Sequence, residues 1–292
     1  MKRYNDVYMS LRKRLKDAGI ETFALDARLI LAFAANKTQS ELVRDMNLYV
    51  NDDFENKVAA LTERRLSGEH VAYITGEWEF YGLPVAVNSD VLIPRIDTEV
   101  LAEKAIELLH GREESARVLD LCCGSGCVSA AIASNVPGVR IVAADISLAA
   151  LRVCRQTVLK NRLSRYIVCM DVDARENPPM LLGKFDMIVC NPPYVPTAEI
   201  PLLDASVRDF EPHLALDGGN DGLDFYRSIT EKWRVILKDR GCMLFEVGEG
   251  QAESVKKMME QNGFAAVQIF PDTAGTSRVV AGIINEGGNE NG

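Results

Sequence analysis

Residues 117–133 read Arg117-Val118-Leu119-Asp120-Leu121-Cys122-Cys123-Gly124-Ser125-Gly126-Cys127-Val128-Ser129-Ala130-Ala131-Ile132-Ala133, a short apolar strand, a turn of small residues and a helix. Gly124 and Gly126 allow positive φ and close approach of a ligand, and the helix offers unpaired N–H groups at its N-terminus. No lysine follows Gly126, which excludes a P-loop, and Ser129 replaces the third glycine of the dinucleotide fingerprint. The stretch therefore predicts a nucleotide-binding α/β fold whose ligand is a nucleoside without phosphates.

The next two strand candidates, 139–144 and 166–170, both lead into carboxylates. Asp145 lies about twenty residues after the glycine turn, the offset at which nucleotide-binding sheets place a ribose-binding carboxylate. Asp171 and Val172 follow the later strand, where they would hold the amine and the face of an adenine. A purely structural role for Asp171 and Val172 stays open.

A fourth strand candidate, 185–190, runs into the tetrapeptide Asn191-Pro192-Pro193-Tyr194. Each proline fixes its own φ and lacks an N–H, so the loop is stiff before any ligand arrives. The Asn191 side-chain oxygen and the Pro192 carbonyl would accept the two hydrogens of a planar –NH2 group, with the Tyr194 ring beside it. The alternative is that the prolines only end a buried strand.

An acidic strand end, a glycine turn and an amide-holding loop together favour S-adenosylmethionine as cofactor and methyl transfer as the reaction. An amide nitrogen held by two acceptors would attack the methyl group in line, without a strong base. The three histidines, His70, His110 and His213, show no nucleophile or metal arrangement, so no metal site is expected. The predicted catalytic residues are Asn191, Pro192, Pro193 and Tyr194. The predicted cofactor-binding residues are Asp120, Cys122, Cys123, Gly124, Ser125, Gly126, Asp145, Asp171, Val172 and Asn191.

Beyond these motifs, the chain resembles the HemK/PrmC family of protein glutamine methyltransferases. The resemblance rests on residues 73–82, 91–99, 120–126, 191–194, 211–222 and 275–278. It implies methylation of the glutamine side chain in the Gly-Gly-Gln motif of class-1 peptide-chain release factors, which would be the protein partner. The sequence departs from the family pattern at His70, Ile96, Cys122-Cys123 and Val172, and the last change should weaken stacking on the adenine.

The order of elements predicts an α/β class: a Rossmann-like, class I methyltransferase sheet of seven mostly parallel strands, preceded by a small helical bundle and a linking β-hairpin. The strands expected are 117–121, 139–144, 166–170, 185–190, 242–247, 265–270 and 278–284. We expect a substrate-docking helical domain at 1–73, a hairpin at 74–93, the methyltransferase domain at 94–285 and a disordered tail at 286–292. The bundle's alternative role is simply to pack on the catalytic domain.

Apolar stripes place the helices of this bundle. Val7, Leu11, Leu15 and Ala18 recur at helical spacing before Gly19, and Leu25, Leu29 and Phe33 form a second stripe. Thr38 and Glu41 fit a capping box. Phe54, Val58 and Leu61 mark a further helix ending near Gly68.

Composition indicates which classes of partner this chain can bind. A formal net charge of −9 over 292 residues argues against nucleic-acid binding, which needs clustered Lys and Arg. No apolar run or signal core points to a membrane, so a cytoplasmic protein is expected. The 7 cysteines lack metal-binding spacings and should be reduced. Two alternatives remain, a nucleic-acid methyltransferase acting on an exocyclic amine and a non-catalytic nucleotide-binding adaptor.

Overall fold

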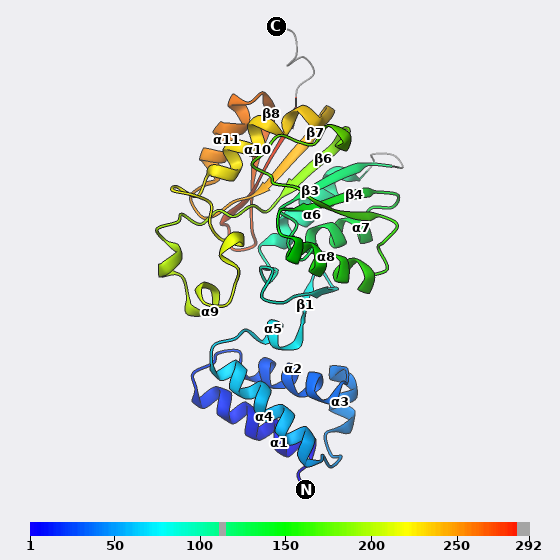
Figure 1. Cartoon of the computed structure of the whole chain (residues 1–292), viewed down its shortest axis with the longest axis vertical. Coiled ribbons are helices and arrows are strands. Elements are labelled where there is room, and N and C mark those ends of the chain that lie inside the picture. Colours follow the sequence, from blue (N-terminus) through cyan, green and yellow to red (C-terminus); the bar gives the residue numbers. More distant parts are fainter. Residues whose placement is uncertain (111–114, 285–292) are drawn as a thin grey trace. The chain divides into compact units, whose positions relative to one another are not determined.

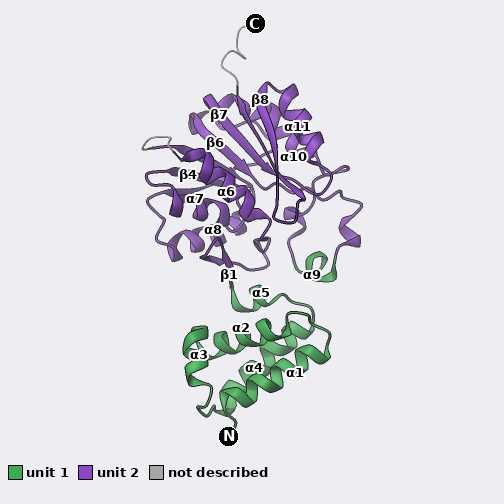
Figure 2. Ribbon diagram, turned by 180° about the vertical axis from the view of Figure 1, so that it is seen from behind, with its two compact units in different colours: residues 1–77, 204–210 green, residues 78–203, 211–292 purple. Residues whose placement is uncertain are grey.

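The structure is a computed structural model, and it describes residues 1–110 and 115–284. The chain divides into two compact units, one formed by residues 1–77 with 204–210 and the other by residues 78–203 with 211 onward (Figure 2). The tail predicted to be disordered, 286–292, lies outside the described residues.

The first unit is helical. Its helices are α1 (Tyr4–Asp17), α2 (Phe23–Ala35), α3 (Gln39–Asp45), α4 (Asp52–Leu66), α5 (Val71–Thr75) and α9 (Ala205–Arg208). The capping box predicted at Thr38 is present, because Thr38 and Glu41 bond each other's backbone N–H groups. Of the first predicted stripe, Val7, Leu11 and Leu15 are buried, whereas Ala18 follows the end of α1 and is exposed.

The stripe predicted for the second helix is wrong. Leu25 and Phe33 are exposed, and α2 instead buries a face that includes Ala27, Ile30 and Leu31. The helix is apolar almost all the way round, so its periodicity does not select one face. Packing against α1, α3, α4 and α5 selects the face containing Asp26, whose carboxylate pairs with Arg65 at 2.7 Å.

The second unit is built on a sheet of seven strands in the order β5-β4-β3-β6-β7-β9-β8 (Figure 1). These strands are β3 (Arg117–Leu121), β4 (Arg140–Asp145), β5 (Ile167–Asp171), β6 (Phe185–Cys190), β7 (Leu237–Glu246), β8 (Phe264–Pro271) and β9 (Ser277–Ile284). The first five are parallel, and β9 is antiparallel to both its neighbours. The predicted seven-stranded, mostly parallel sheet is thus confirmed.

Helices cover both faces of this sheet. On one side lie α6 (Thr98–Leu109), α7 (Cys127–Asn135) and α8 (Leu148–Lys160), and on the other α10 (Asp224–Lys232) and α11 (Ala252–Gln261) (Figure 1). Short 3₁₀ turns occur at η1 (Met180–Leu182), η2 (Ile200–Leu202), η3 (His213–Ala215) and η4 (Arg234–Ile236). The hairpin strands β1 (Glu77–Phe80) and β2 (Leu83–Ala86) form a separate two-stranded sheet, and β2 packs on α8.

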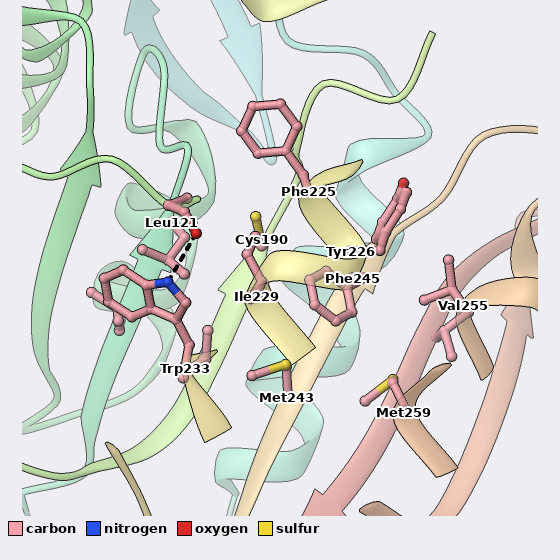
Figure 3. Close-up of a cluster of buried hydrophobic side chains, with 14 of the residues drawn as sticks. Leu121, Cys190, Phe225, Tyr226, Ile229, Trp233, Met243, Phe245, Val255 and Met259 are labelled. Carbon is pink, nitrogen blue, oxygen red and sulfur yellow. Dashed lines mark hydrogen bonds between the residues drawn. The ribbon is translucent and has the colours of Figure 1, made fainter. Parts of the chain in front are cut away.

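The core between the sheet and α10 and α11 contains Trp233 and Tyr226, the two largest fully buried side chains of the described residues (Figure 3). Trp233 is fully buried and its indole N–H donates to the Ala174 carbonyl at 2.9 Å. Tyr226 packs edge-on against Phe245 with ring centroids 5.3 Å apart, and its hydroxyl donates to the Glu246 carbonyl at 2.9 Å. The satisfied polar tips let these large rings be buried. They tie α10 and its C-terminal end to the segment that follows β5 and to the last residue of β7.

Candidate active site

Strand register brings the predicted site residues to one edge of the sheet. Leu121 pairs with both Ala144 and Cys190, and Asp145 pairs with Asp171. The loops that follow β3, β4, β5 and β6 therefore begin side by side at the carboxyl ends of parallel strands. This is where open α/β sheets bind their ligands.

The turn between β3 and α7 uses its two glycines differently. Both have positive φ, +51° at Gly124 and +75° at Gly126, and Cys122 shares this conformation at 57°. A Cβ on Gly124 would meet no heavy atom within 4 Å, whereas one on Gly126 would lie 2.5 Å from the Cys154 Sγ. Gly124 therefore faces open space, and Gly126 allows α7 to pack closely on α8.

The other two residues of this turn, Cys123 and Ser125, are buried. The Cys123 N–H donates to the Ala144 carbonyl at 3.0 Å, which ties the turn to the end of β4. The seven cysteines all lie within residues 115–284, and none of them forms a disulfide in the structure.

Asp120 holds the start of α7. Its Oδ2 accepts hydrogen bonds from the Ser129 N–H at 3.1 Å and the Ser129 hydroxyl at 2.6 Å. Burial raises the pKa of Asp120 to about 7, although these two bonds lower it. Ser129, where a dinucleotide site would have glycine, thus has a structural partner, and at least one oxygen of Asp120 serves the fold.

Asp145, the last residue of β4, is fixed by backbone donors. Its Oδ2 accepts from the Gly124 N–H and its Oδ1 from the Ser147 N–H, both at 2.9 Å. A carboxylate offers about four lone-pair positions, so it retains acceptors for two hydroxyls. Burial raises the pKa of Asp145. Asp171 beside it is exposed, and Val172 is buried.

The tetrapeptide 191–194 directly follows β6. Pro192 and Pro193 are buried, and Asn191 and Tyr194 are half-buried. The Asn191 Nδ2 donates to the Thr98 Oγ1 at 3.3 Å, so its Oδ1 is directed elsewhere. Burial raises the pKa of Tyr194 to about 12, which keeps the phenol neutral.

Residues 216–222 brace this loop. A parallel bridge pairs Val195 with Asp217. The Val195 N–H donates to the Leu216 carbonyl and the Gly218 N–H donates to the Val195 carbonyl, both at 2.9 Å. A Cβ on Gly218 would lie 2.7 Å from the Tyr194 Cα, which explains the glycine. The Gln251 Nε2 also donates to the Tyr194 carbonyl at 2.9 Å. The loop is therefore held by the protein itself.

Charged pairs lie around the loop. Arg95 pairs with the buried Glu211 at 2.6 Å, and Arg278 pairs with Asp97 and Asp272, each at 3.1 Å. Burial raises the pKa of Glu211, while Arg95 lowers it. Glu211 thus orients Arg95 in this structure.

Several of these residues were not singled out from the sequence. Thr98 and Gln251 contact the loop from elements far away in the chain. Thr98 lies in the family-like segment 91–99 without a predicted role at the site, and nothing local marks Gln251. His213 is exposed and lies 4.0 Å from Asp217, outside any nucleophile arrangement. Within residues 1–110 and 115–284, no group of three or more metal-ligating side chains occurs, and no helix is long and apolar enough to cross a membrane.

Family models match most of the chain. The PrmC N-terminal domain matches residues 6–76, and the methyltransferase small domain matches residues 96–218. The second match includes the ends of β3, β4, β5 and β6 and the loop 191–194.

Individual relatives extend this similarity. The chain is 38% identical over 255 residues to a release factor glutamine methyltransferase of Bradyrhizobium diazoefficiens, covering 86% of this chain and 84% of the relative. It is 36% identical over 273 residues to one of Geobacter sulfurreducens, covering 94% of each. Among solved structures, a methyltransferase from Pyrococcus furiosus superposes with a TM-score of 0.52 at 15% identity, covering 78% of this chain and all of the other, which supports the fold.

Proposed function

Because this chain belongs to the release factor glutamine methyltransferase family, we propose that it methylates the side-chain amide nitrogen of the glutamine in the Gly-Gly-Gln motif of class-1 release factors. The observation that carries the proposal is the braced loop 191–194 at the end of β6, with Asn191 turned so that its nitrogen is engaged by Thr98. Such a loop suits a carboxamide, which brings two N–H donors in one plane.

The residues at the strand ends fit S-adenosylmethionine, the proposed cofactor. The open face of Gly124 admits a ligand against the backbone, and Asp145 is oriented to accept from ribose hydroxyls. Asp171 is exposed and would accept from the adenine amine, with the buried Val172 next to it in the chain. When bound, the cofactor supplies a methyl group activated by a positively charged sulfur.

The protein's own contribution to the reaction is positioning. The Asn191 Oδ1 and the Pro192 carbonyl accept the two amide hydrogens of the substrate, which directs the nitrogen lone pair away from them. These same oxygens stabilise positive charge as it develops on the nitrogen. As the N–C bond forms, the bond from the methyl group to the sulfur breaks and the neutral thioether leaves, and one of the two N–H protons is then lost to water. Tyr194, a neutral ring, lies beside the amide. Orientation of this kind lowers barriers by several kcal/mol, up to roughly 7–11 in well-oriented cases.

The test offers the protein two acceptors side by side with S-adenosylmethionine carrying a labelled methyl group, namely a purified class-1 release factor and nucleic acid. We expect label on the release factor, at the glutamine of its Gly-Gly-Gln motif, as located by peptide mass spectrometry. A release factor with that glutamine changed to alanine is the control. Label on nucleic acid alone would contradict the proposal, and cofactor binding without any transfer would favour an adaptor.

We further propose that the first unit docks the release factor and that the protein acts in the cytoplasm. A protein substrate needs contacts beyond one side chain, and this unit exposes the apolar residues Val43, Leu48 and Tyr49. Exposed apolar side chains are frequent at interaction sites when they occur together.

A further inference from the structure

Glu246 is a buried carboxylate next to the amide-holding loop. Cys190 pairs with Phe245 in parallel register, and both side chains belong to the core under α10 and α11. Side chains alternate between the faces of a sheet. The residues that follow, Asn191 and Glu246, therefore lie side by side on the opposite face, where α6 begins at Thr98.

These three side chains form one hydrogen-bonded cluster. The Asn191 Nδ2 donates to the Thr98 Oγ1 at 3.3 Å. Burial raises the pKa of Glu246, and the side chains of Thr98 and Asn191 lower it, which places both next to the Glu246 carboxylate. Thr98 and Glu246 are each 2% exposed. A carboxylate this deeply buried is costly to the fold, so its presence calls for a specific purpose.

The fold alone does not account for this carboxylate. Among the described residues, the Glu246 Oε2 has no hydrogen-bond partner. The nearby cation Arg278 forms its ion pairs with Asp97 and Asp272 instead. The backbone carbonyl of Glu246, which Tyr226 bonds, would hold the strand end equally well with another side chain at this position.

We propose that Glu246 is a positioning residue that, with Thr98, keeps the nitrogen of the Asn191 amide toward itself and the oxygen toward the substrate. The inference rests on the proposed function. An ionised carboxylate only accepts hydrogen bonds, so it pairs with Nδ2 and never with Oδ1. A glutamine at position 246 both donates and accepts, so it pairs with Asn191 in either orientation and removes the bias.

The primary test is Glu246→Gln, assayed on the release factor. Burial raises the pKa of Glu246 to about 7, so the assays are made above that pH, where the carboxyl is ionised. We expect kcat to fall roughly 10- to 100-fold because the acceptor is misplaced, with cofactor Kd retained and the thermal midpoint not lowered, since glutamine carries no buried charge.

The matched control is Asp186→Asn, on the same strand as the loop but at its opposite end. Asp186 accepts from the Arg117 N–H at 2.8 Å and the Lys238 Nζ at 2.7 Å, far from the loop. This variant should keep the wild-type kcat.

A double-variant cycle with Thr98→Val separates positioning from general damage. If Thr98 and Glu246 both act through Asn191, the double variant should be no slower than the slower single variant.

Unchanged kcat in Glu246→Gln would overturn the inference, as would multiplied effects in the double variant. A parallel loss of kcat, cofactor affinity and stability would show a merely structural role. Failure of the unsubstituted protein to methylate the release factor would instead overturn the proposed function, and this inference with it.

Discussion

Asp120 and Glu246 are buried carboxyl groups whose pKa burial raises to about 7. In an unfolded chain such groups titrate near about 3.9 and 4.3. The folded protein therefore binds more protons than the unfolded chain between roughly pH 4 and 7. Their stabilising contribution is complete below that window and is lost as the pH rises through the folded-state pKa.

Asp120→Asn tests this linkage. Asparagine keeps an acceptor for Ser129 but does not titrate, so the variant should lose less unfolding free energy than the wild type as the pH rises from roughly 4 to 8. We expect the difference to reach a few kcal/mol. Chemical denaturation at a series of pH values measures it. Parallel pH profiles for the two proteins would contradict the buried, protonated state of Asp120.

At the scale of elements, the two glycines of the turn from β3 into α7 have different roles: Gly126 serves the packing of α7 and Gly124 serves ligand contact. Gly126→Ala should destabilise the protein by more than about 1 kcal/mol, because its Cβ would clash with the Cys154 Sγ at positive φ. Gly124→Ala has the same type of backbone strain but no clash, so its main effect should be weaker cofactor binding. Thermal unfolding and cofactor titration on both variants distinguish these effects, with each variant the other's control. Greater destabilisation by Gly124→Ala would contradict this assignment.

Local sequence signals predicted the sheet well, because each of β3, β4, β5 and β6 is a short apolar run that ends directly at a glycine turn, an acidic residue or the Asn191 loop. They failed where tertiary packing decides. The stripe through Leu25 was wrong because α2 is apolar on several sides, and β7 begins at Leu237, five residues before the predicted start at Cys242. The polar residues 238–240 and a register shift opposite Phe185 hide that beginning.

The candidate site was predictable to the same extent. The residues at the ends of β3, β4, β5 and β6 could be found because each directly follows an apolar run. Thr98 and Gln251 could not, since they reach the loop from elements distant in sequence. Long-range hydrogen bonds leave no periodic signal.

At the scale of the whole molecule, the two units are not contiguous in sequence. Residues 204–210, which include α9, belong to the helical unit, where Phe210 packs against Gly68. After the amide-holding loop, residues 204–210 therefore belong to the first unit, and the second unit resumes at Glu211. Nothing in the local sequence marks this excursion.

The docking role of the first unit predicts a change in substrate affinity alone. Val43 and Leu48 are 67% and 55% exposed, so Val43→Ser with Leu48→Ser should alter stability by only about 0.5 kcal/mol each or less. We expect KM for the release factor to rise several-fold while kcat and cofactor Kd stay unchanged. Steady-state kinetics with varied release factor measures this, and Met180→Ser, at an exposed apolar site of the second unit, is the control. An unchanged KM would contradict docking through Val43 and Leu48.

The most direct test of the central claim, that Asn191 positions a carboxamide for methylation, compares kcat with cofactor affinity in Asn191→Ala. Removing the acceptor should lower kcat at least about 100-fold while cofactor Kd stays within about twofold. Asp145→Ala is the reciprocal control, and its main effect should be weaker cofactor binding. The account would be contradicted if Asn191→Ala kept near wild-type turnover, or if it lost cofactor affinity as severely as Asp145→Ala.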